Sequence, residues 1–310
     1  MTTITAKSIL ASRHADSYEH RVDTLLLRYP RWIHAEGRTH RVMRIGEDME
    51  VEVRTPSFMD DENLSRNASS SRAIPVKRLI KDVIDDPAVP LYWGKNQKGM
   101  QASEELTGHE LQLTTEAWHR GKWRAIETAK ELEHAGAHKQ LANRVLEPYS
   151  HITVVATATE WTNFFALRDH PDAEPHICML AQAIKKAMAE ATVQTLRAGE
   201  WHLPFVYPDE RAGLPIDSSG QPLALKVSVA RCASTSYKTV DGFDMTIGRA
   251  IELHDKLAAS NPMHASPMEH QCYADRNVGN EVDGDLWARP KLWGNFQAFC
   301  QYRRVLEVGA

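Results

Sequence analysis

The sequence has little cysteine and none of the cysteine spacings that bind zinc or build disulfide frameworks. Its four cysteines are scattered along the chain and form no CxxC pair: Cys178, Cys232, Cys272 and Cys300. They therefore predict neither a metal site nor a disulfide-stabilised fold, and they indicate reduced, packed thiols.

Long apolar runs and an excess of basic charge are also missing. The longest apolar runs fall far short of the roughly 18 to 20 residues that span a bilayer, and residues 1–7 contain no signal-peptide core. The formal net charge is −4, so no overall basic field attracts a nucleic acid polymer. We therefore expect a cytoplasmic protein that binds no membrane, and the charge argues against a nucleic-acid-binding module.

What is present favours an α+β fold with more helix than strand. The chain has 310 residues, of which 42% are hydrophobic and 25% charged, enough for one large domain or two small ones. Helical spacing of apolar residues predicts helices over 73–86, 114–146 with a break at Gly136, 172–196 and 245–260. Strands are expected at 22–35 with a bend or sheet edge at Pro30, at 49–53, 151–159 and 227–230. Residues 207–221 read as a loop, 44–64 as an acidic, solvated insertion, and the chain from Asn277 as a polar, irregular tail.

Polar residues gather first at Thr39-His40-Arg41 and in the serine-rich segment 65–72. Serine and asparagine side chains compete for backbone hydrogen bonds, which favours a loop. Its hydroxyls, free N–H groups and guanidinium forks suit a phosphate and a pyrimidine edge. The alternative is a serine-rich helix N-cap ahead of Ile74-Pro75.

Two further clusters contain candidate ligand-binding residues. One holds Asn143-Arg144 near Pro148, followed by Asn163 and Arg168; in a helix the last two lie roughly 140° apart, so they need not share a ligand within one subunit. The other holds 231–237 and 266–270, which ends in His270. The alternatives are a surface arginine with a capping asparagine, and a structural histidine.

Taken together, these clusters resemble the flavin-dependent thymidylate synthases, whose signature is R-H-R-x-x-S-x-N-E-x-S-x-R. Segment 29–35 resembles the stretch that leads into it, 144–148 the family's Arg-x-x-x-Pro element, and 163–168 its Asn-Phe-x-x-Leu-Arg element. The signature itself is matched by His40, Arg41, Ser65, Asn67, Ser70 and Arg72.

The order of the matching segments differs from the family's. An Ala-Arg-Val-Ser-Tyr-like and a Ser-Pro-Phe-Glu-His-like segment precede the signature in the family, whereas 232–237 and 266–270 follow it here. The order therefore looks circularly permuted, which chains tolerate when the joined ends lie close together. The resemblance covers about 22–180 and 228–271, and implies an α+β catalytic domain over 1–310 with a mixed sheet and long helices.

The resemblance implies reductive methylation of dUMP to dTMP, with FAD as cofactor and methylenetetrahydrofolate and NADPH as cosubstrates. It implies a homotetramer whose sites are shared between subunits. The catalytic residues would be Ser70, Arg72 and Arg168; nucleotide binding would add Glu36, Ser69, Ser71 and Arg144; and His40, Arg41, Asn67, Asn163, Ser236 and His270 would lie near the flavin, His270 by the flavin or folate.

Several positions depart from the family's pattern. Thr39 replaces the first signature arginine, Ala68 its glutamate, and Glu36 a frequent glutamine, while 44–64 insert 21 residues. Thr157 and Thr159 stand where an asparagine and an arginine near the flavin are expected. A carboxylate at Glu36 accepts from an exocyclic amine, so methylation or hydroxymethylation of another pyrimidine nucleotide, such as dCMP, is an alternative. A nucleotide-binding homologue without activity is the other alternative.

Overall fold

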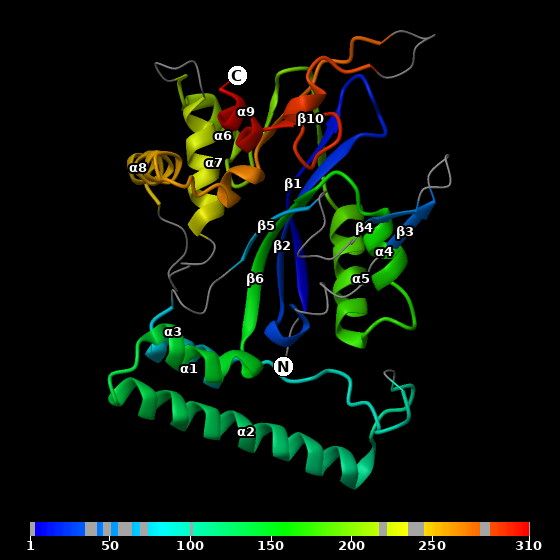
Figure 1. The fold of residues 1–310 in the computed structure, drawn as a ribbon, viewed down its shortest axis with the longest axis vertical. Coiled ribbons are helices and arrows are strands. Elements are labelled where there is room, and N and C mark those ends of the chain that lie inside the picture. The colour runs from blue at the N-terminus through cyan, green and yellow to red at the C-terminus, as the bar shows by residue number, and fades with distance from the viewer. Residues whose placement is uncertain are drawn as a thin grey trace.

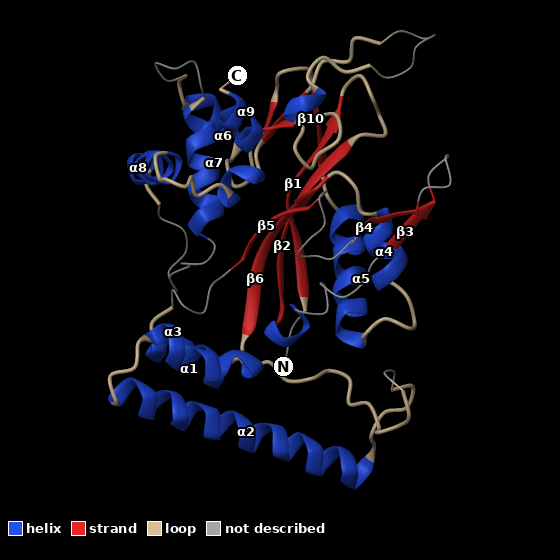
Figure 2. Cartoon of the chain, in the orientation of Figure 1, coloured by secondary structure: helices blue, strands red, loops and turns tan. Residues whose placement is uncertain are grey.

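A five-stranded mixed sheet forms the centre of the computed structural model, in the order β5-β6-β2-β1-β7 (Figures 1 and 2). The structure describes residues 4–34, 74–99, 102–216, 222–234, 245–279 and 286–309, and the backbone alone of 42–45, 51–54 and 64–68. The strands are β1 (Thr5–His14), β2 (Arg21–Pro30), β5 (Leu64–Ala68), β6 (His151–Ala158) and β7 (Val193–Leu196). All neighbours are antiparallel except β1 and β7.

One face of this sheet is apolar and is covered by a helix. In β2 and β6 the pairs Leu25–Ala156 and Leu27–Val154 share this face, as the two-residue period of a strand requires, and the pairs Thr24–Thr157 and Leu26–Val155 lie on the other. Helix α5 (Pro175–Ala189) packs Leu180 and Ile184 into the same buried cluster. Its first turn is capped by Glu174, whose carboxylate accepts from two backbone N–H groups. The short helix α4 (Thr162–Arg168) lies beside α5.

A helical layer closes the end of the sheet where β6 begins (Figure 1). It contains α1 (Val76–Asp85), α2 (Gly108–His134), α3 (Lys139–Ala142) and the 3-10 helix η3 (Asn143–Tyr149). Val83, Ile126 and Leu146 from these elements share one buried cluster. Gly136 has φ 84°, a left-handed conformation that lets the chain turn just after α2.

The C-terminal part packs at the other end of the sheet. Its strands β8 (Trp201–His202), β9 (Cys272–Ala274) and β10 (Phe299–Gln301) form a three-stranded sheet. The remaining elements are η1 (Arg31–His34), the hairpin β3 (Val42–Ile45) and β4 (Val51–Arg54), α6 (Pro208–Gly213), α7 (Leu223–Ala233), α8 (Ile247–Ala258), η5 (Ser266–Glu269), η6 (Pro290–Leu292) and α9 (Tyr302–Val308).

The structure confirms the α+β class, the mixed sheet and several elements. The expected helices at 73–86 and 245–260 correspond to α1 and α8, and the expected strand at 151–159 corresponds to β6. Gly136 follows the long helix α2, which begins earlier than expected. No helix among the described residues combines the length and apolarity needed to cross a membrane.

Other sequence predictions are wrong. Residues 227–230 belong to helix α7, because apolar residues bury almost all of its faces and hide its period. The expected helix over 172–196 ends at Ala189, and 193–196 form β7. The loop at 207–221 contains α6, and strand β1 was not expected. The expected strand at 22–35 ends at Pro30, where the chain bends as expected but continues as the 3-10 helix η1 and not as a second extended segment. Pro30 lies in a strand inside the sheet and not at its edge, and its missing N–H interrupts no further ladder bond.

The tail from Asn277 is more ordered than its polarity predicts. Within 286–309, Trp287, Phe296 and Phe299 pack into one cluster with Val22 of β2 and Cys272 of β9. Backbone pairing of β10 with β9 makes this segment an integral part of the small sheet. Aromatic residues spaced without a helix or strand period gave no signal for this packing.

Candidate functional site

The second face of the central sheet carries a buried polar row. Thr24 of β2 is directly opposite Thr157 of β6, and both side chains are fully buried. Their hydroxyl oxygens are 2.8 Å apart, so one donates to the other. The alternation that places Leu25 and Ala156 under α5 places these two threonines on the opposite face.

His270 continues this row from the C-terminal part of the chain. It directly follows η5, which packs against both β5 and α7. Its Nδ1 is 2.9 Å from Thr157 Oγ1, while its Nε2 is buried and has no hydrogen-bond partner among the residues that the structure describes. Burial lowers the pKa of His270 from 6.5 to about 3, so the imidazole is neutral at physiological pH.

His202 extends the row from the other side. Its Nε2 is 2.8 Å from Thr24 Oγ1 and its Nδ1 is 2.6 Å from Ser12 Oγ, whose second partner is the side-chain amide of Gln194 at 2.8 Å. Burial, with smaller contributions from His270 and Arg211, lowers the pKa of His202 to about 3. The row therefore runs Gln194–Ser12–His202–Thr24–Thr157–His270 and joins strands β7, β1, β8, β2 and β6 to η5; we call it the polar relay.

The strand that carries part of the serine-rich cluster lies directly beside the polar relay. β5 pairs with β6 so that Ser65 is opposite Thr157 and Asn67 is opposite Val155. Because η5 contacts β5, the chain around 65–68 and the chain around 266–270 meet here, about 200 residues apart in sequence. Two of the segments that carry the family resemblance are thus adjacent in space.

The other described candidates lie elsewhere. Arg144 is on η3, before β6, where its Nη1 is 3.2 Å from Glu147 Oε1 and its side chain is 55% exposed. Asn163 is half-buried at the start of α4, after β6. Eight strand residues separate η3 from the turn into α4, roughly 26 Å at 3.3 Å per residue. Arg144 and Asn163 are therefore not brought together within one chain.

Arg168 and His270 are on opposite sides of the central sheet. Arg168 is the last residue of α4 and is buried. α4 lies beside α5, and its Phe164 and Phe165 pack against the core under α5. His270 bonds to Thr157 on the other face. Within one chain these two residues therefore do not lie in the same site.

The remaining predicted site residues fall outside the described residues. They are Glu36, His40, Arg41, Ser69, Ser70, Ser71, Arg72 and Ser236. For Ser65 and Asn67 the structure gives the backbone and its pairing only.

The cysteines lack the environment of a nucleophilic thiolate. Burial raises the pKa of Cys178, Cys232, Cys272 and Cys300, the last to about 12. A reactive cysteine has a lowered pKa beside a cation or a helix N-terminus. Among the described parts of the chain, no group of three or more His, Cys, Asp or Glu residues is arranged to hold a metal ion.

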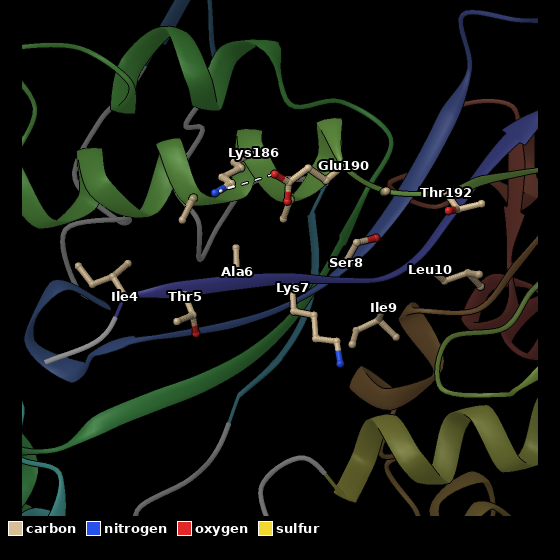
Figure 3. A pocket seen from close by; sticks show the side chains of 13 residues that line it. Ile4, Thr5, Ala6, Lys7, Ser8, Ile9, Leu10, Lys186, Glu190 and Thr192 are labelled. Carbon is tan, nitrogen blue, oxygen red and sulfur yellow. Dashed lines mark ion pairs between the residues drawn. The ribbon is translucent and has the colours of Figure 1, made fainter. Parts of the chain in front are cut away.

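A groove of about 670 Å³ follows the outer edge of the sheet between β1 and α5. Figure 3 shows Lys186 of α5 and Glu190, the residue after that helix, on one side and Thr5 to Leu10 of β1 on the other. Lys186 Nζ is 3.9 Å from a Glu190 carboxylate oxygen, across exposed side chains. Neither the predicted site residues nor the members of the polar relay line this groove.

Sequence reasoning missed most of the polar relay. Ser12 lies in a strand that was not expected, and His202 is a single histidine without a surrounding motif. The threonines lie in strands rich in β-branched residues, where threonine is common for packing reasons alone. Only contacts between residues distant in sequence reveal that these groups form one hydrogen-bonded row.

Comparison with known proteins gives little further guidance. No family model matches the chain, and no match was found among curated proteins. Among solved structures, the UMP/dUMP methylase PolB from Streptomyces cacaoi with bound 5-Br dUMP is similar at a TM-score of 0.44 and 16% identity, covering 61% of this chain and 91% of that chain. The same enzyme with 5-Br UMP gives 0.46 and 18%, covering 61% and 90%. Likenesses of this size carry no argument about fold or function.

Proposed function

We propose that this protein is a flavin-dependent enzyme that methylates C5 of a uracil nucleotide, with dUMP as substrate and 1–310 acting as one catalytic domain. The observation that carries the proposal is the adjacency of two matched segments. His270, at the end of the Ser-Pro-Met-Glu-His segment, bonds to Thr157, which is paired with Ser65 of the signature. Such proximity is required if both segments serve one site.

The geometry at the ends of the matched regions supports a circular permutation. A permuted chain must begin and end its matched region at neighbouring points, because an uninterrupted chain once joined them. The matched region begins at Val22 and ends near Gln271. Val22 and Cys272, the residue after Gln271, share one buried cluster.

The residues at the polar relay fit a flat heterocycle with N–H and carbonyl groups. His270 Nε2 and Gln271 Oε1 are buried, and neither has a hydrogen-bond partner in the described part of the chain. Buried polar atoms are normally paired, so two unpaired atoms in consecutive residues point to a missing partner. Ring edges of FAD and of uracil offer such groups. When bound, FAD would carry the reducing equivalents from NADPH, and methylenetetrahydrofolate would supply the one-carbon unit.

The remaining roles follow the resemblance. Arg72, Arg144 and the backbone of 69–71 would hold the nucleotide phosphate and base, with Glu36 at the base. Arg168 would stabilise negative charge that develops on the pyrimidine ring. Ser70 would position the substrate. The flavin would lie against His40, Arg41, Asn67, Asn163, Ser236 and His270.

We further propose that the site is shared between subunits of a homotetramer. Arg168 and His270 lie on opposite sides of the sheet in one chain, so a site that needs both takes them from different chains. Inactive Arg168→Lys subunits mixed with inactive His270→Ala subunits should then recover activity, because some mixed sites contain both wild-type residues. Mixtures that stay as inactive as either parent, despite exchanging subunits, would overturn the shared site.

The test of the proposed function is turnover by FAD-loaded protein supplied with methylenetetrahydrofolate and NADPH. We expect dTMP from dUMP. Production of the 5-methyl nucleotide from dCMP in place of dUMP would establish the alternative substrate that Glu36 suggests. FAD binding without turnover of either nucleotide would leave the inactive homologue, which Thr39 and Ala68 suggest.

A further inference from the structure

The number of protons available for hydrogen bonds within the polar relay is fixed. Ser12, Thr24 and Thr157 each have one hydroxyl proton, and neutral His202 and His270 each have one ring proton. These five groups are joined by four hydrogen bonds of 2.6 to 2.9 Å. Each bond uses one proton, so one of the five protons remains outside the row.

The location of the remaining proton decides whether His270 Nε2 is a hydrogen-bond donor or an acceptor. If Ser12 donates to His202 Nδ1, then His202 donates from Nε2 to Thr24. Thr24 donates to Thr157, which donates to His270 Nδ1, and the last proton is on His270 Nε2. If the row runs the other way, His270 donates from Nδ1, its Nε2 is a bare acceptor, and the remaining proton is on Ser12. If the direction changes at Thr24 or Thr157, His270 again donates from Nδ1, and the remaining proton is on that threonine, without an acceptor in the row.

The structure favours the first direction because of Gln194. Its amide nitrogen donates to Ser12 Oγ at 2.8 Å and cannot accept a proton from it. In the reverse direction the buried Ser12 hydroxyl proton has no acceptor, and His270 Nε2 lacks a donor. In the forward direction only the His270 Nε2–H is unsatisfied, so one buried group fewer lacks a partner.

We propose that Gln194, Ser12, His202, Thr24 and Thr157 position His270 by fixing its tautomer, so that Nε2 carries the proton and offers a hydrogen bond to an oxygen atom of a ligand. Nε2 points away from Thr157, which holds the other ring nitrogen. The identity of the ligand rests on the proposed function, in which the oxygen is a carbonyl of the flavin or the pyrimidine. The tautomer itself does not depend on that function.

Nitrogen-15 NMR of histidine-labelled protein without ligand tests the relay directly. We expect a protonated, pyrrole-type Nε2 and a bare, pyridine-type Nδ1 for His270, assigned with His270→Gln. In Gln194→Glu the carboxylate accepts from Ser12, so the two His270 resonances should exchange their types. Thr195→Glu is the matched control: it places the same charge on the neighbouring, exposed position of β7, outside the relay, and should leave His270 unchanged.

A second variant keeps the test informative if the row is disturbed. Thr157→Val removes the link to His270, so Gln194→Glu should no longer change His270 in that background, whereas Thr157→Ser should transmit the change. A wild-type His270 protonated at Nδ1, or a Gln194→Glu protein with an unchanged His270, would overturn the relay.

Adding FAD separates the relay from the proposed function. A shift of the His270 Nε2 resonance on FAD binding, lost in Gln194→Glu, supports both. An exchange of types in Gln194→Glu with no FAD binding by any variant retains the relay and overturns the flavin assignment.

Discussion

The two faces of the central sheet are both buried near Ala158, but they are buried by different chemistry. Under α5, Leu25, Leu27 and Val154 meet Leu180 and Ile184 without a polar atom among their side chains. On the other face Thr24 and Thr157 meet two neutral histidines. Apolar packing stabilises the first face in proportion to the area buried, whereas the second gains little net free energy from each hydrogen bond and loses much if one partner is removed. We interpret the first face as structural and the second as a device for positioning His270.

Truncating the apolar face should have the largest effect on stability. Leu27→Ala removes a fully buried side chain, so the free energy of unfolding should fall by about 2–5 kcal/mol. Urea denaturation followed by circular dichroism measures the change. The folded fraction should keep the His270 tautomer of the wild type; a changed tautomer would mean that the two faces are not independent.

Breaking a hydrogen bond of the polar face should lower the free energy of unfolding by less. The loss should depend on whether the new side chain keeps a hydroxyl group and not on its volume. Thr157→Val keeps the shape and leaves His270 Nδ1 and Thr24 without their partner, at a cost of about 1–3 kcal/mol. Thr157→Ser removes a methyl group but keeps the hydroxyl, and should cost less than Thr157→Val. The same denaturation measurement decides; a serine variant less stable than the valine variant would show that packing, not hydrogen bonding, dominates this face.

Acid should destabilise the polar face specifically. The ordinary pKa of histidine is 6.5, and burial lowers that of His202 to about 3 in the folded protein. Between these pH values His202 is therefore protonated in the unfolded chain but not in the folded one. Neutral His202 therefore costs no stability above pH 6.5, and the free energy of unfolding falls as the pH drops from 6.5 toward 3. From pH 7 to pH 5 this amounts to roughly 2 kcal/mol. His202→Gln should lose that part of the pH dependence, as unfolding curves at both pH values would show; an identical dependence would contradict a neutral, buried His202.

The smallest effect on stability is expected at Arg144, far from both faces of the sheet near Ala158. Its ion pair with Glu147 is exposed, so Arg144→Ala should change the free energy of unfolding by less than about 1 kcal/mol. If Arg144 holds the nucleotide phosphate, the KM for dUMP should rise while the melting temperature stays near that of wild type. Glu147→Gln is the control, since it breaks the same ion pair but should leave the KM nearly unchanged.

The contrast between the faces also explains what the sequence could predict. The elements of the apolar face carry short-range signals: α5 shows its helical period and β6 is rich in β-branched residues, so both were expected. Helix α7 was missed because it is buried on nearly all sides and has no polar face. The short motifs led to His270, Asn163, Arg144 and Arg168. His202, Ser12 and Gln194 could not be predicted, because their connection to His270 exists only through pairing of strands far apart in sequence.

The account depends most on whether the positioned His270 serves a flavin next to a pyrimidine nucleotide. The most direct measurement is the visible absorption spectrum of protein incubated with FAD and freed of unbound cofactor, recorded before and after dUMP is added. We predict a bound-flavin band that shifts when dUMP binds in wild type, with a smaller shift in Gln194→Glu. A protein that stays colourless after incubation with FAD would contradict the proposed function.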